Sequence, residues 1–378
     1  MPTVSFAPNA RHPLVPVTSE ATTVIGHIAR ASHVIGTGLV ALDVVHGLDP
    51  SCAPGLYAGG TCGNVLAALA YLGWASFPVA RLASDFAGLR VAEDLSGFGV
   101  KTDYLSLAPV QRTPVVIQRA VVDAKGQVSH RFSMRCPKCR AWFPQYQPVT
   151  RAAMADLLAG VSAPDVVFVD RLSAGAVALA EDGFQRGALV YFEPSAQCEP
   201  SLLERMLAVT HVLKYSADRT SGFAAVRTPR PTHLLEVETR GAAGLRFRGT
   251  MLGRQGQAWR ALPSFVAAEL RDAAGAGDWL SAGFIDFVAQ AGLEGFDGLP
   301  ADIIEAGLRT GQAYSAWACG FEGARGGMYQ QTVGTVRDIV AATLNAGRVV
   351  APPSNADRAI APDILAKLCS HGASVRSA

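Results

Sequence analysis

Asp272-Ala273-Ala274-Gly275-Ala276-Gly277-Asp278 leads directly into the helix-like run Trp279-Leu280-Ser281-Ala282-Gly283-Phe284-Ile285-Asp286-Phe287-Val288. Two glycines with small neighbours let the backbone turn its N–H groups toward one point, where the following helix adds partial positive charge. Asp278 stands at the helix start, where its carboxylate can face a hydroxyl beside a bound anion. The pattern predicts a hydroxyl that is activated next to a phosphoryl group. The alternative is a glycine-rich turn that only caps a buried helix.

The composition is typical of a globular chain with a sizeable core. Its 378 residues are 49% hydrophobic, which allows one large α/β domain or two domains of ordinary size. No apolar run approaches the roughly 18–20 residues that span a bilayer, and the N-terminus lacks a basic-then-apolar signal, so we expect a cytoplasmic protein. Seven dispersed cysteines favour reduced thiols over a disulfide framework. The net charge of +2 predicts neither nucleic-acid nor membrane binding.

Short β-rich runs alternate with helix-like segments through most of the chain. The strand candidates are Val34–Val40, Phe77–Leu82, Val166–Val169, Ala188–Phe192, Val212–Lys214 and Leu234–Val237. The helix candidates are Asn64–Tyr71, Gly88–Phe98, Gly277–Ala291 and Ala301–Cys319. This alternation predicts an α/β fold with an open, mostly parallel sheet and helices on both faces. We expect an irregular N-terminal arm (residues 1–31), a main domain (32–350) and a C-terminal extension (351–378).

One region breaks the alternation and predicts a hairpin. Thr113–Gln118 and Gln127–Ser133 are strand-like, and Asp123-Ala124-Lys125-Gly126 forms a turn signal between them. A hairpin inserted into an α/β domain can cover the carboxyl ends of the strands, where such sheets bind ligands. We therefore expect a small β lid at about residues 46–58 and 109–145.

A second glycine-rich constellation lies early in the chain. Gly59-Gly60-Thr61-Cys62-Gly63-Asn64 opens the helix-like run Val65–Gly73, and the Asn64 amide can donate and accept hydrogen bonds toward adjacent hydroxyls. Upstream, Gly36–Asp43 places the Asp43 carboxylate at the end of the first predicted strand. Together these residues suit a polyol. Taken singly, Asp43 is equally interpretable as a turn residue and Asn64 as a helix N-cap.

The order of these features resembles that of the PfkB, or ribokinase-like, carbohydrate kinases. The shared features are a strand with Asp, then Gly-Gly-x-x-x-Asn opening a helix, then a β lid, then Asp-x-x-Gly-Ala-Gly-Asp late in the chain. The resemblance covers about residues 33–345. It implies a ribokinase-like three-layer sandwich with a small β lid, and an ATP-dependent phosphotransferase acting on a hydroxyl of a sugar or sugar-like molecule with Mg²⁺. Because lid-to-lid dimers occur in that family, it also implies a homodimer.

The resemblance assigns a role to each matching residue. Asp278 would be the general base, and the anion-hole amides would come from Gly275, Ala276 and Gly277. The sugar would be held by Asp43, Gly59, Gly60 and Asn64. Glu238-Thr239-Arg240-Gly241-Ala242-Ala243-Gly244-Leu245 is similar to the family's Thr-x-Gly-x-x-Gly nucleotide loop, so ATP would lie along Thr239, Gly241 and Gly244. Gly323 and Ala324 match the family's late Gly-Ala loop. In the family this loop lies near the nucleotide and, in some members, near a monovalent cation.

The sequence departs from the family where Asn-x-x-Glu usually orders Mg²⁺ around the phosphates. The matching segment is Leu213-Lys214-Tyr215-Ser216-Ala217-Asp218-Arg219, with Ser for the Asn and Arg for the Glu. A guanidinium offers donors only and cannot bind a cation. Either Asp218 or Glu193 replaces the Glu through water, or Arg219 contacts phosphate directly. Lys214 and Ser216 are expected beside the nucleotide. The departure also leaves room for a sugar or nucleotide binder that does not turn its ligand over.

The lid region carries a Cys-x-x-Cys motif and a basic cluster. Cys136-Pro137-Lys138-Cys139 is half of a zinc knuckle, and we expect structural Zn²⁺, a redox pair or unmetallated thiols there. His130, Cys52 or a second subunit's pair would complete a zinc site. The basic residues between Arg112 and Arg140 suit either a solvated face or an acidic acceptor. A nucleoside acceptor is a further alternative, and single-stranded nucleic acid is a less favoured ligand.

Overall fold

The computed structural model describes residues 31–49, 51–122, 128–194, 199–219, 235–252, 258–350 and 368–369. The chain divides into Met1–Ala31 and a main unit, Ser32–Ala378, to which every element below belongs. The predicted N-terminal arm lies outside the described residues except for Ala31, and so does the predicted C-terminal extension except for residues 368–369.

The main sheet is mostly parallel, as predicted. In the described part of the chain it has the strand order β13-β12-β11-β10-β9-β8-β1-β4-β5, and only β12 and β13 run antiparallel to their neighbours. The strands are β1 (His33–Thr37), β4 (Ala75–Leu82), β5 (Leu105–Leu107), β8 (Val166–Val169), β9 (Leu189–Phe192), β10 (Val212–Ser216), β11 (Leu235–Thr239), β12 (Leu245–Gly249) and β13 (Arg260–Leu262). The central strands are continuous apolar runs because helices cover both of their faces.

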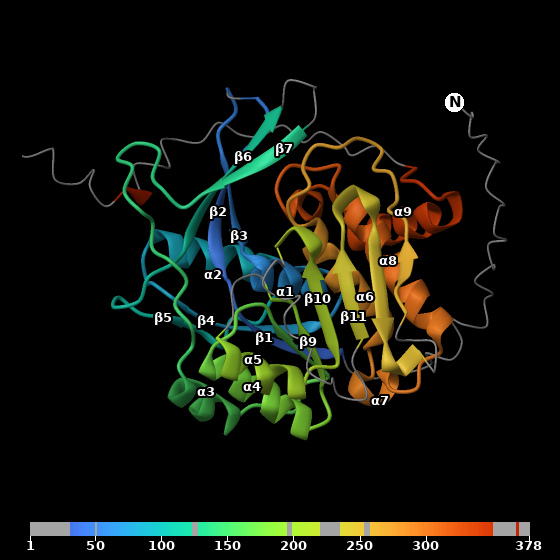
Figure 1. Cartoon of the computed structure of the whole chain (residues 1–378). Helices are drawn as coiled ribbons and strands as arrows, with labels where there is room; N and C mark the ends of the chain where they lie inside the picture. The colour runs from blue at the N-terminus through green and yellow to red at the C-terminus, as the bar shows by residue number, and fades with distance from the viewer. Residues whose placement is uncertain are drawn as a thin grey trace, which may run out of the picture. The chain divides into compact units, whose positions relative to one another are not determined.

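Alternate residues of the central strands enter two separate hydrophobic cores. Phe168 and Tyr191 pack on one side, whereas Val167 and Phe192 pack on the other. The first side is covered by α1 (Thr61–Tyr71), α6 (Ala276–Val288), α8 (Ala301–Ala318) and α9 (Val333–Ala346). The second is covered by α3 (Arg151–Leu158), α4 (Ala174–Gln185) and α5 (Pro200–Ala208). The three layers are visible in Figure 1.

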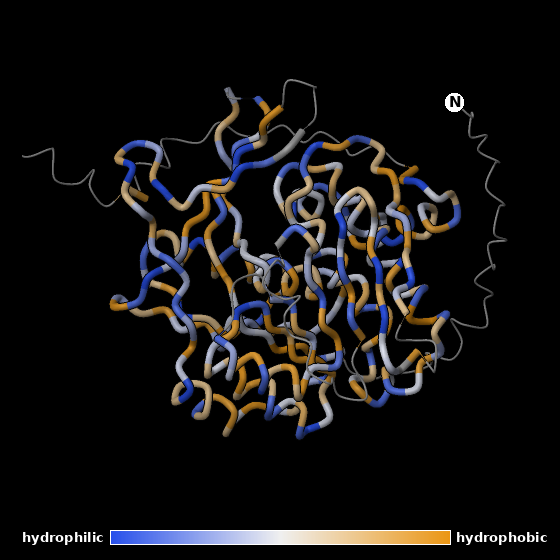
Figure 2. The backbone as a smooth tube through the Cα atoms, in the orientation of Figure 1, coloured by the Kyte–Doolittle hydropathy of each residue, from blue (hydrophilic) through white to orange (hydrophobic). Residues whose placement is uncertain are grey.

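The remaining helices are short or lie at the margins of these layers. They are α2 (Phe86–Gly97), which packs near the second sheet, and α7 (Gly292–Phe296), which follows α6. Both hydrophobic and hydrophilic residues occur along the helices of the second layer in Figure 2, as expected for helices with one buried face. Within the described residues, no helix has both the length and the apolar composition needed to cross a membrane.

A second sheet forms the predicted lid. Its strand order is β3-β2-β6-β7, with β2 (Ala41–His46), β3 (Gly55–Gly59), β6 (Val115–Val122) and β7 (Val128–Ser133). The predicted hairpin is confirmed, since β6 and β7 pair antiparallel with Gln118 opposite Phe132. Its predicted turn at 123–126 lies outside the described residues.

The sequence analysis placed Asp43 at the end of the first strand, and this prediction was wrong. The first strand ends at Thr37, and Asp43 lies in the middle of β2, within the lid sheet. The chain leaves the main sheet between these strands, where the Leu39 amide donates a hydrogen bond to Asp170 Oδ1 at 2.8 Å. Both halves of Val34–Asp43 have strand-like sequences, so the sequence alone does not show that they belong to two sheets.

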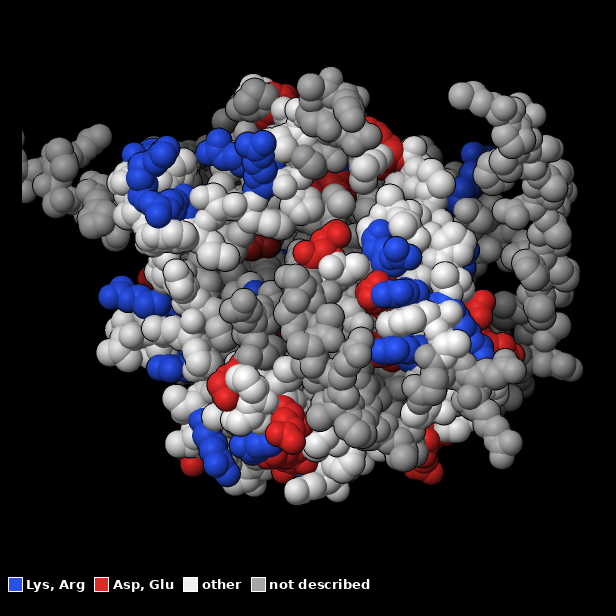
Figure 3. Space-filling model, in the orientation of Figure 1, with Lys and Arg blue, Asp and Glu red and all other residues white. Residues whose placement is uncertain are grey.

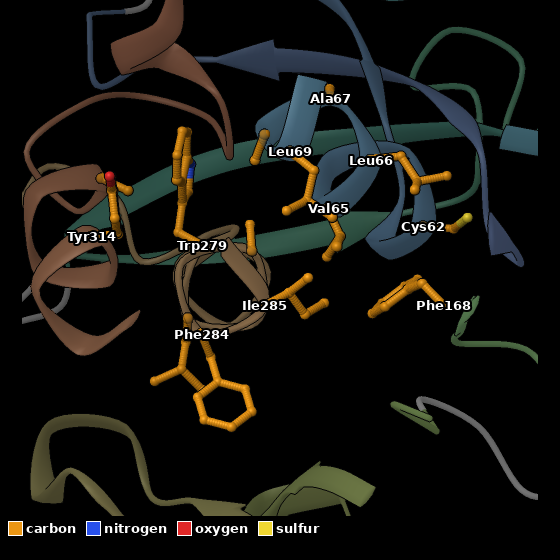
Figure 4. Packing of buried hydrophobic residues seen from close by; sticks show 14 of the residues in the cluster. Cys62, Val65, Leu66, Ala67, Leu69, Phe168, Trp279, Phe284, Ile285 and Tyr314 are labelled. Atoms are coloured by element: carbon orange, nitrogen blue, oxygen red, sulfur yellow. The ribbon is translucent and has the colours of Figure 1, made fainter. Parts of the chain in front are cut away.

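Aromatic packing fixes the position of α6, which follows the Asp272–Asp278 motif. Trp279 stacks on Tyr314 of α8 with a ring-centroid distance of 5.8 Å, and its Nε1 donates to the Ala324 carbonyl at 2.9 Å. Figure 4 shows Ile285 of the same helix among Val65 and its neighbours on α1. These contacts are buried, so the first turn of α6 is packed against α8 and Ala324, and the helix also packs along α1.

Candidate active site

The predicted anion-binding turn forms the start of α6. Gly275 is the N-cap residue and has the left-handed φ of 74°, and a Cβ at this position would lie 2.4 Å from the Ala324 Cβ. The Ala276 amide donates to the Ala273 carbonyl at 3.3 Å, and the helical ladder begins with the Trp279 amide, which donates to Gly275. The amides of Gly277 and Asp278 therefore belong to the first turn, where N–H groups have no acceptor within the helix.

Asp278 contacts the sugar-side motif directly. Asn64, in the first turn of α1, donates from Nδ2 to Asp278 Oδ2 at 2.7 Å. The Asn64 Oδ1 atom is buried and has no hydrogen-bond partner among the described residues. Burial and the negative charge of Glu193 raise the pKa of Asp278 to about 7, although the Asn64 hydrogen bond and the charge of Lys214 lower it. A carboxylate with such a pKa is suited to accept a proton near neutral pH.

Asp43 lies in the same region as the predicted glycines. A Cβ on Gly59 would lie 2.0 Å from Asp43 Oδ2, so only glycine fits beside this carboxylate. The Gly60 amide donates a hydrogen bond to Asp43. Burial raises the pKa of Asp43 to about 7, against the opposing charge of Arg325. The four sugar-side residues of the sequence analysis thus converge where β3 enters α1.

A buried ion pair lies beneath the first turn of α6. Lys214, at 1% exposure, pairs through Nζ with Glu193 Oε1 and donates to the Gly277 carbonyl at 2.9 Å. Ser281 Oγ donates to the other oxygen of Glu193 at 2.5 Å. The pair joins the ends of β9 and β10 to the α6 motif, and it fixes a positive charge beside the predicted anion site.

The residues predicted to contact the nucleotide follow the ends of β10 and β11. Ser216 and Thr239 are register partners on these neighbouring parallel strands. Gly241 and Gly244 flank the turn from β11 to β12, in which the Arg240 amide donates to the Gly244 carbonyl at 2.8 Å. Asp218 is exposed in the 3-10 turn Ala217–Arg219. These positions lie at or just after the carboxyl ends of β10 and β11, next to Lys214.

Of the two carboxylates that the sequence offers for Mg²⁺, Asp218 fits better. Both oxygens of Glu193 accept hydrogen bonds from protein donors, Lys214 and Ser281. Asp218 is exposed and can hold Mg²⁺ through water, which is this ion's usual mode of binding to proteins.

The late Gly-Ala loop, for which the resemblance implies a nearby monovalent cation in some members of the family, is held by hydrogen bonds within the protein. Its carbonyl oxygens at Gly323, Ala324 and Arg325 accept hydrogen bonds from Gly326, Trp279 and Met328. The nearby Asp272 carboxylate accepts from the Gly323 amide at 2.9 Å and from the Gln118 side chain of the lid. The loop is therefore the place where the lid and the α6 motif meet, and the monovalent cation stays a prediction.

A polar cluster near Asp278 was missed by the sequence analysis. Asp170 and Arg171 directly follow β8, and Arg171 Nη1 lies 3.5 Å from Asp170 Oδ2. Tyr146 is their neighbour, and burial, together with the charge of Asp170, raises its pKa. The Tyr146 hydroxyl and Arg171 Nη1 are buried without a hydrogen-bond partner among the described residues. Their position after a buried strand was the available signal, because ligands bind at the carboxyl ends of parallel strands.

Cys136 and Cys139 lie outside this site, in the loop after β7. Neither residue proposed to complete a zinc site joins them: His130 Nδ1 lies 3.4 Å from Asp272 Oδ1, and Cys52 donates to Asp49 Oδ2 at 3.4 Å. The thiol that approaches them within the described residues is that of Cys369.

Comparison with known proteins relates the fold to one group of enzymes. No protein-family model matches the chain, and no curated protein sequence matches it. Solved structures do match: ribokinase from Giardia lamblia is 13% identical with a TM-score of 0.63, over 83% of this chain and 99% of that one. Fructokinase from Vibrio cholerae O395 is 18% identical with a TM-score of 0.61, over 82% and 99%. A Burkholderia thailandensis nucleoside kinase is 16% identical with a TM-score of 0.58, over 85% and 100%.

These similarities establish the fold of the chain. It is the ribokinase-like α/β fold, in agreement with the architecture that the two glycine motifs and the strand pattern predict.

Proposed function

We propose that this protein is an ATP-dependent kinase that phosphorylates a hydroxyl of a sugar or sugar-like small molecule. The observation that carries the proposal is the hydrogen bond between Asn64 and Asp278 at the N-terminus of α6. It joins a polar side chain suited to a polyol, a carboxylate with a pKa of about 7 and a helix start suited to a phosphate.

Asp278 acts as the general base in this proposal. Its Oδ2 accepts from Asn64, which leaves Oδ1 for the acceptor hydroxyl. The hydroxyl oxygen attacks the terminal phosphorus of ATP, the bond from that phosphorus to the bridging oxygen breaks, and ADP leaves with the bond's electron pair. The hydroxyl proton moves to Asp278. The products are a phosphate ester, ADP and a protonated carboxyl group.

The start of α6 stabilises the charge on the phosphoryl group as it moves. The amides of Gly277 and Asp278 and the helix dipole point to this position, and a preorganised array of this kind is an effective form of electrostatic catalysis. Lys214 adds a fixed positive charge beneath the same turn. Gly275 shapes the turn. The Ala276 amide already donates a hydrogen bond to the Ala273 carbonyl.

The acceptor is held by side chains that surround Asp278. Asp43 and the Asn64 Oδ1 atom accept from hydroxyls, whereas Arg171 and Tyr146 donate to a hydroxyl or carboxylate. The names of the similar structures support this class of acceptor, since one contains fructose, ADP and a calcium ion and another contains inosine. Arg171 favours testing sugar acids beside neutral sugars.

The nucleotide lies along Ser216, Thr239, Gly241 and Gly244 in this proposal. Mg²⁺ neutralises part of the phosphate charge when it is bound, and Ser216 and Asp218 are the residues that would face it. The replacement of the usual Asn-x-x-Glu predicts weak binding of this ion by the protein itself.

An ADP-release assay across sugars, sugar acids and nucleosides tests the proposal. ADP formation that depends on one acceptor, with a phosphate ester detected by mass spectrometry, is the expected result. Calorimetry on the same panel distinguishes the alternative: tight binding of an acceptor and of ATP without any ADP would show a binding protein and overturn the kinase proposal. A preference for nucleosides would change the acceptor class alone.

A further inference from the structure

Three cysteine thiols converge at the lid, although they are distant in sequence. Cys136 and Cys139 lie in the loop after β7, and Cys369 lies in the C-terminal segment, 230 residues beyond Cys139. Their sulfur atoms all lie within 4.8 Å of one another, and the Cys139 and Cys369 sulfurs are 3.4 Å apart. Figure 1 shows the short red segment that contains residue 368 beside the green loop that follows β7.

The spacing of the sulfurs suits a tetrahedral metal ion. Zinc binds cysteine sulfur at about 2.3 Å, which places two sulfurs of one tetrahedral site about 3.8 Å apart. A disulfide would require about 2.05 Å. The 3.4 Å between the Cys139 and Cys369 sulfurs lies closer to the first value than to the second, and the Cys136 sulfur lies within 4.8 Å of both.

The loop that carries Cys136 and Cys139 has the shape of a metal-binding knuckle. The Cys136 amide donates to the Ala141 carbonyl at 2.8 Å, and the Arg140 amide returns to the Cys136 carbonyl at 2.9 Å. Arg140 has a φ of 64° and is the only non-glycine residue with positive φ in the described part of the chain. Such a conformation is strained for a residue with a Cβ and persists where its surroundings require it.

Backbone amides of the loop are directed at the sulfur atoms. The amides of Lys138 and Cys139 donate to the Cys136 sulfur, and the Ala141 amide donates to the Cys139 sulfur. Hydrogen bonds of this kind orient sulfur atoms as metal ligands. The turn therefore presents the two sulfurs as a preformed pair of ligands.

Positive side chains are close to Cys136 and Cys139 in the sequence of this loop. Arg135, Lys138 and Arg140 are exposed around this loop, and Figure 3 shows Lys and Arg side chains gathered over this part of the molecule. Zinc with three thiolates carries one net negative charge, which these cations partly neutralise. Cys136 is buried, whereas Cys139 is exposed and can exchange with solvent metal.

We propose that Cys136, Cys139 and Cys369 bind a structural zinc ion that ties the C-terminal segment to the lid. Leu368 and Cys369 are partly buried against the main hydrophobic core, so the ion joins three parts of the fold: lid loop, C-terminal segment and core. A fourth ligand completes the tetrahedron. The proposal is independent of the kinase assignment.

The metal content of the full-length chain, purified without a polyhistidine tag or chelator and under reducing conditions, tests the proposal. Elemental analysis should find one zinc ion per chain. Alkylation followed by peptide mass spectrometry should show Cys136, Cys139 and Cys369 protected until a strong chelator is added, whereas Cys52 reacts at once. The proposal would be overturned if no zinc is found and Cys136, Cys139 and Cys369 are alkylated rapidly. A Cys139–Cys369 disulfide would overturn it as well.

Single variants separate the contribution of each thiol. Cys369→Ser and Cys139→Ser should each lower the affinity for zinc by at least about 10-fold in competition with a chromogenic chelator. Cys52→Ser, which changes an exposed thiol outside the cluster, should keep the wild-type affinity. If Cys369→Ser binds zinc as tightly as the wild type, the C-terminal segment is not a ligand. Should a variant fail to fold, the protection pattern of the wild-type thiols still decides the question.

Discussion

Asn64 Nδ2 lies 2.7 Å from Asp278 Oδ2, although 214 residues separate the two side chains in the sequence. One residue belongs to the first turn of α1 and the other to the first turn of α6, and the two helices pack side by side in the same hydrophobic core. The contact brings the N-termini of two helices to one place. The acceptor side and the phosphoryl side of the proposed site therefore both depend on how these two helices pack.

Asp278→Asn should leave the fold intact and lower the rate of ADP release by at least about 100-fold, because an amide cannot accept the acceptor's proton. Circular dichroism and steady-state kinetics measure the two properties. Asp156→Asn, at an exposed position of α3, is the matched control and should have the wild-type rate. Near-wild-type turnover of the Asp278 variant would remove this residue from the role of base.

The pH profile of the rate should follow the ionisation of Asp278. Because its pKa is raised to about 7, ADP release should increase with pH, with its midpoint near pH 7, and level off at higher pH. Asn64→Ala removes a hydrogen bond that lowers this pKa, so the midpoint of the profile should move to higher pH. A midpoint that is unchanged or lower in Asn64→Ala would contradict the assigned pairing.

The stability of the protein should decrease as pH rises from about 4 to about 7. Asp43 and Asp278 have folded-state pKa values of about 7, above the ordinary value of 3.8, so the folded state holds more protons than the unfolded state in this window. Asp43→Asn and Asp278→Asn should each make Tm less dependent on pH, as scanning calorimetry would measure. Asp156→Asn should retain the wild-type dependence of Tm on pH. If the wild type and all three variants show the same dependence, the assignment is refuted.

Removing one partner of the Lys214–Glu193 pair should be strongly destabilising. Lys214→Met leaves a buried carboxylate unpaired and should cost about 3–5 kcal/mol in urea unfolding. The double variant with Glu193→Gln should recover much of this loss without recovering ADP release. For comparison, Arg205→Met breaks the exposed pair with Glu181 and should cost at most about 1 kcal/mol. Full activity of the double variant would show that the Lys214 charge is not needed.

The local elements of the fold were predictable from sequence because their signals are short-range. The apolar run Val166–Val169 forms β8 with the predicted bounds, and the predicted helices after Gly277 and Ala301 appear as α6 and α8. The glycines of the Asp272–Asp278 motif predicted a turn before the helix, and the structure has that turn with Gly275 in the αL conformation. Hydrophobic periodicity and turn chemistry act over a few residues, so a single chain is enough to recognise them.

The tertiary structure decided which distant residues meet. Sequence order could not show that Asp43 belongs to the lid sheet, that Asp170 and Arg171 lie near Asp278, or that Cys369 approaches the Cys136 loop. These outcomes depend on strand order, on the crossing of α1 against α6 and on where the C-terminal segment docks. Such contacts join elements that are far apart along the chain, and their geometry follows from packing of the whole core rather than from any local pattern.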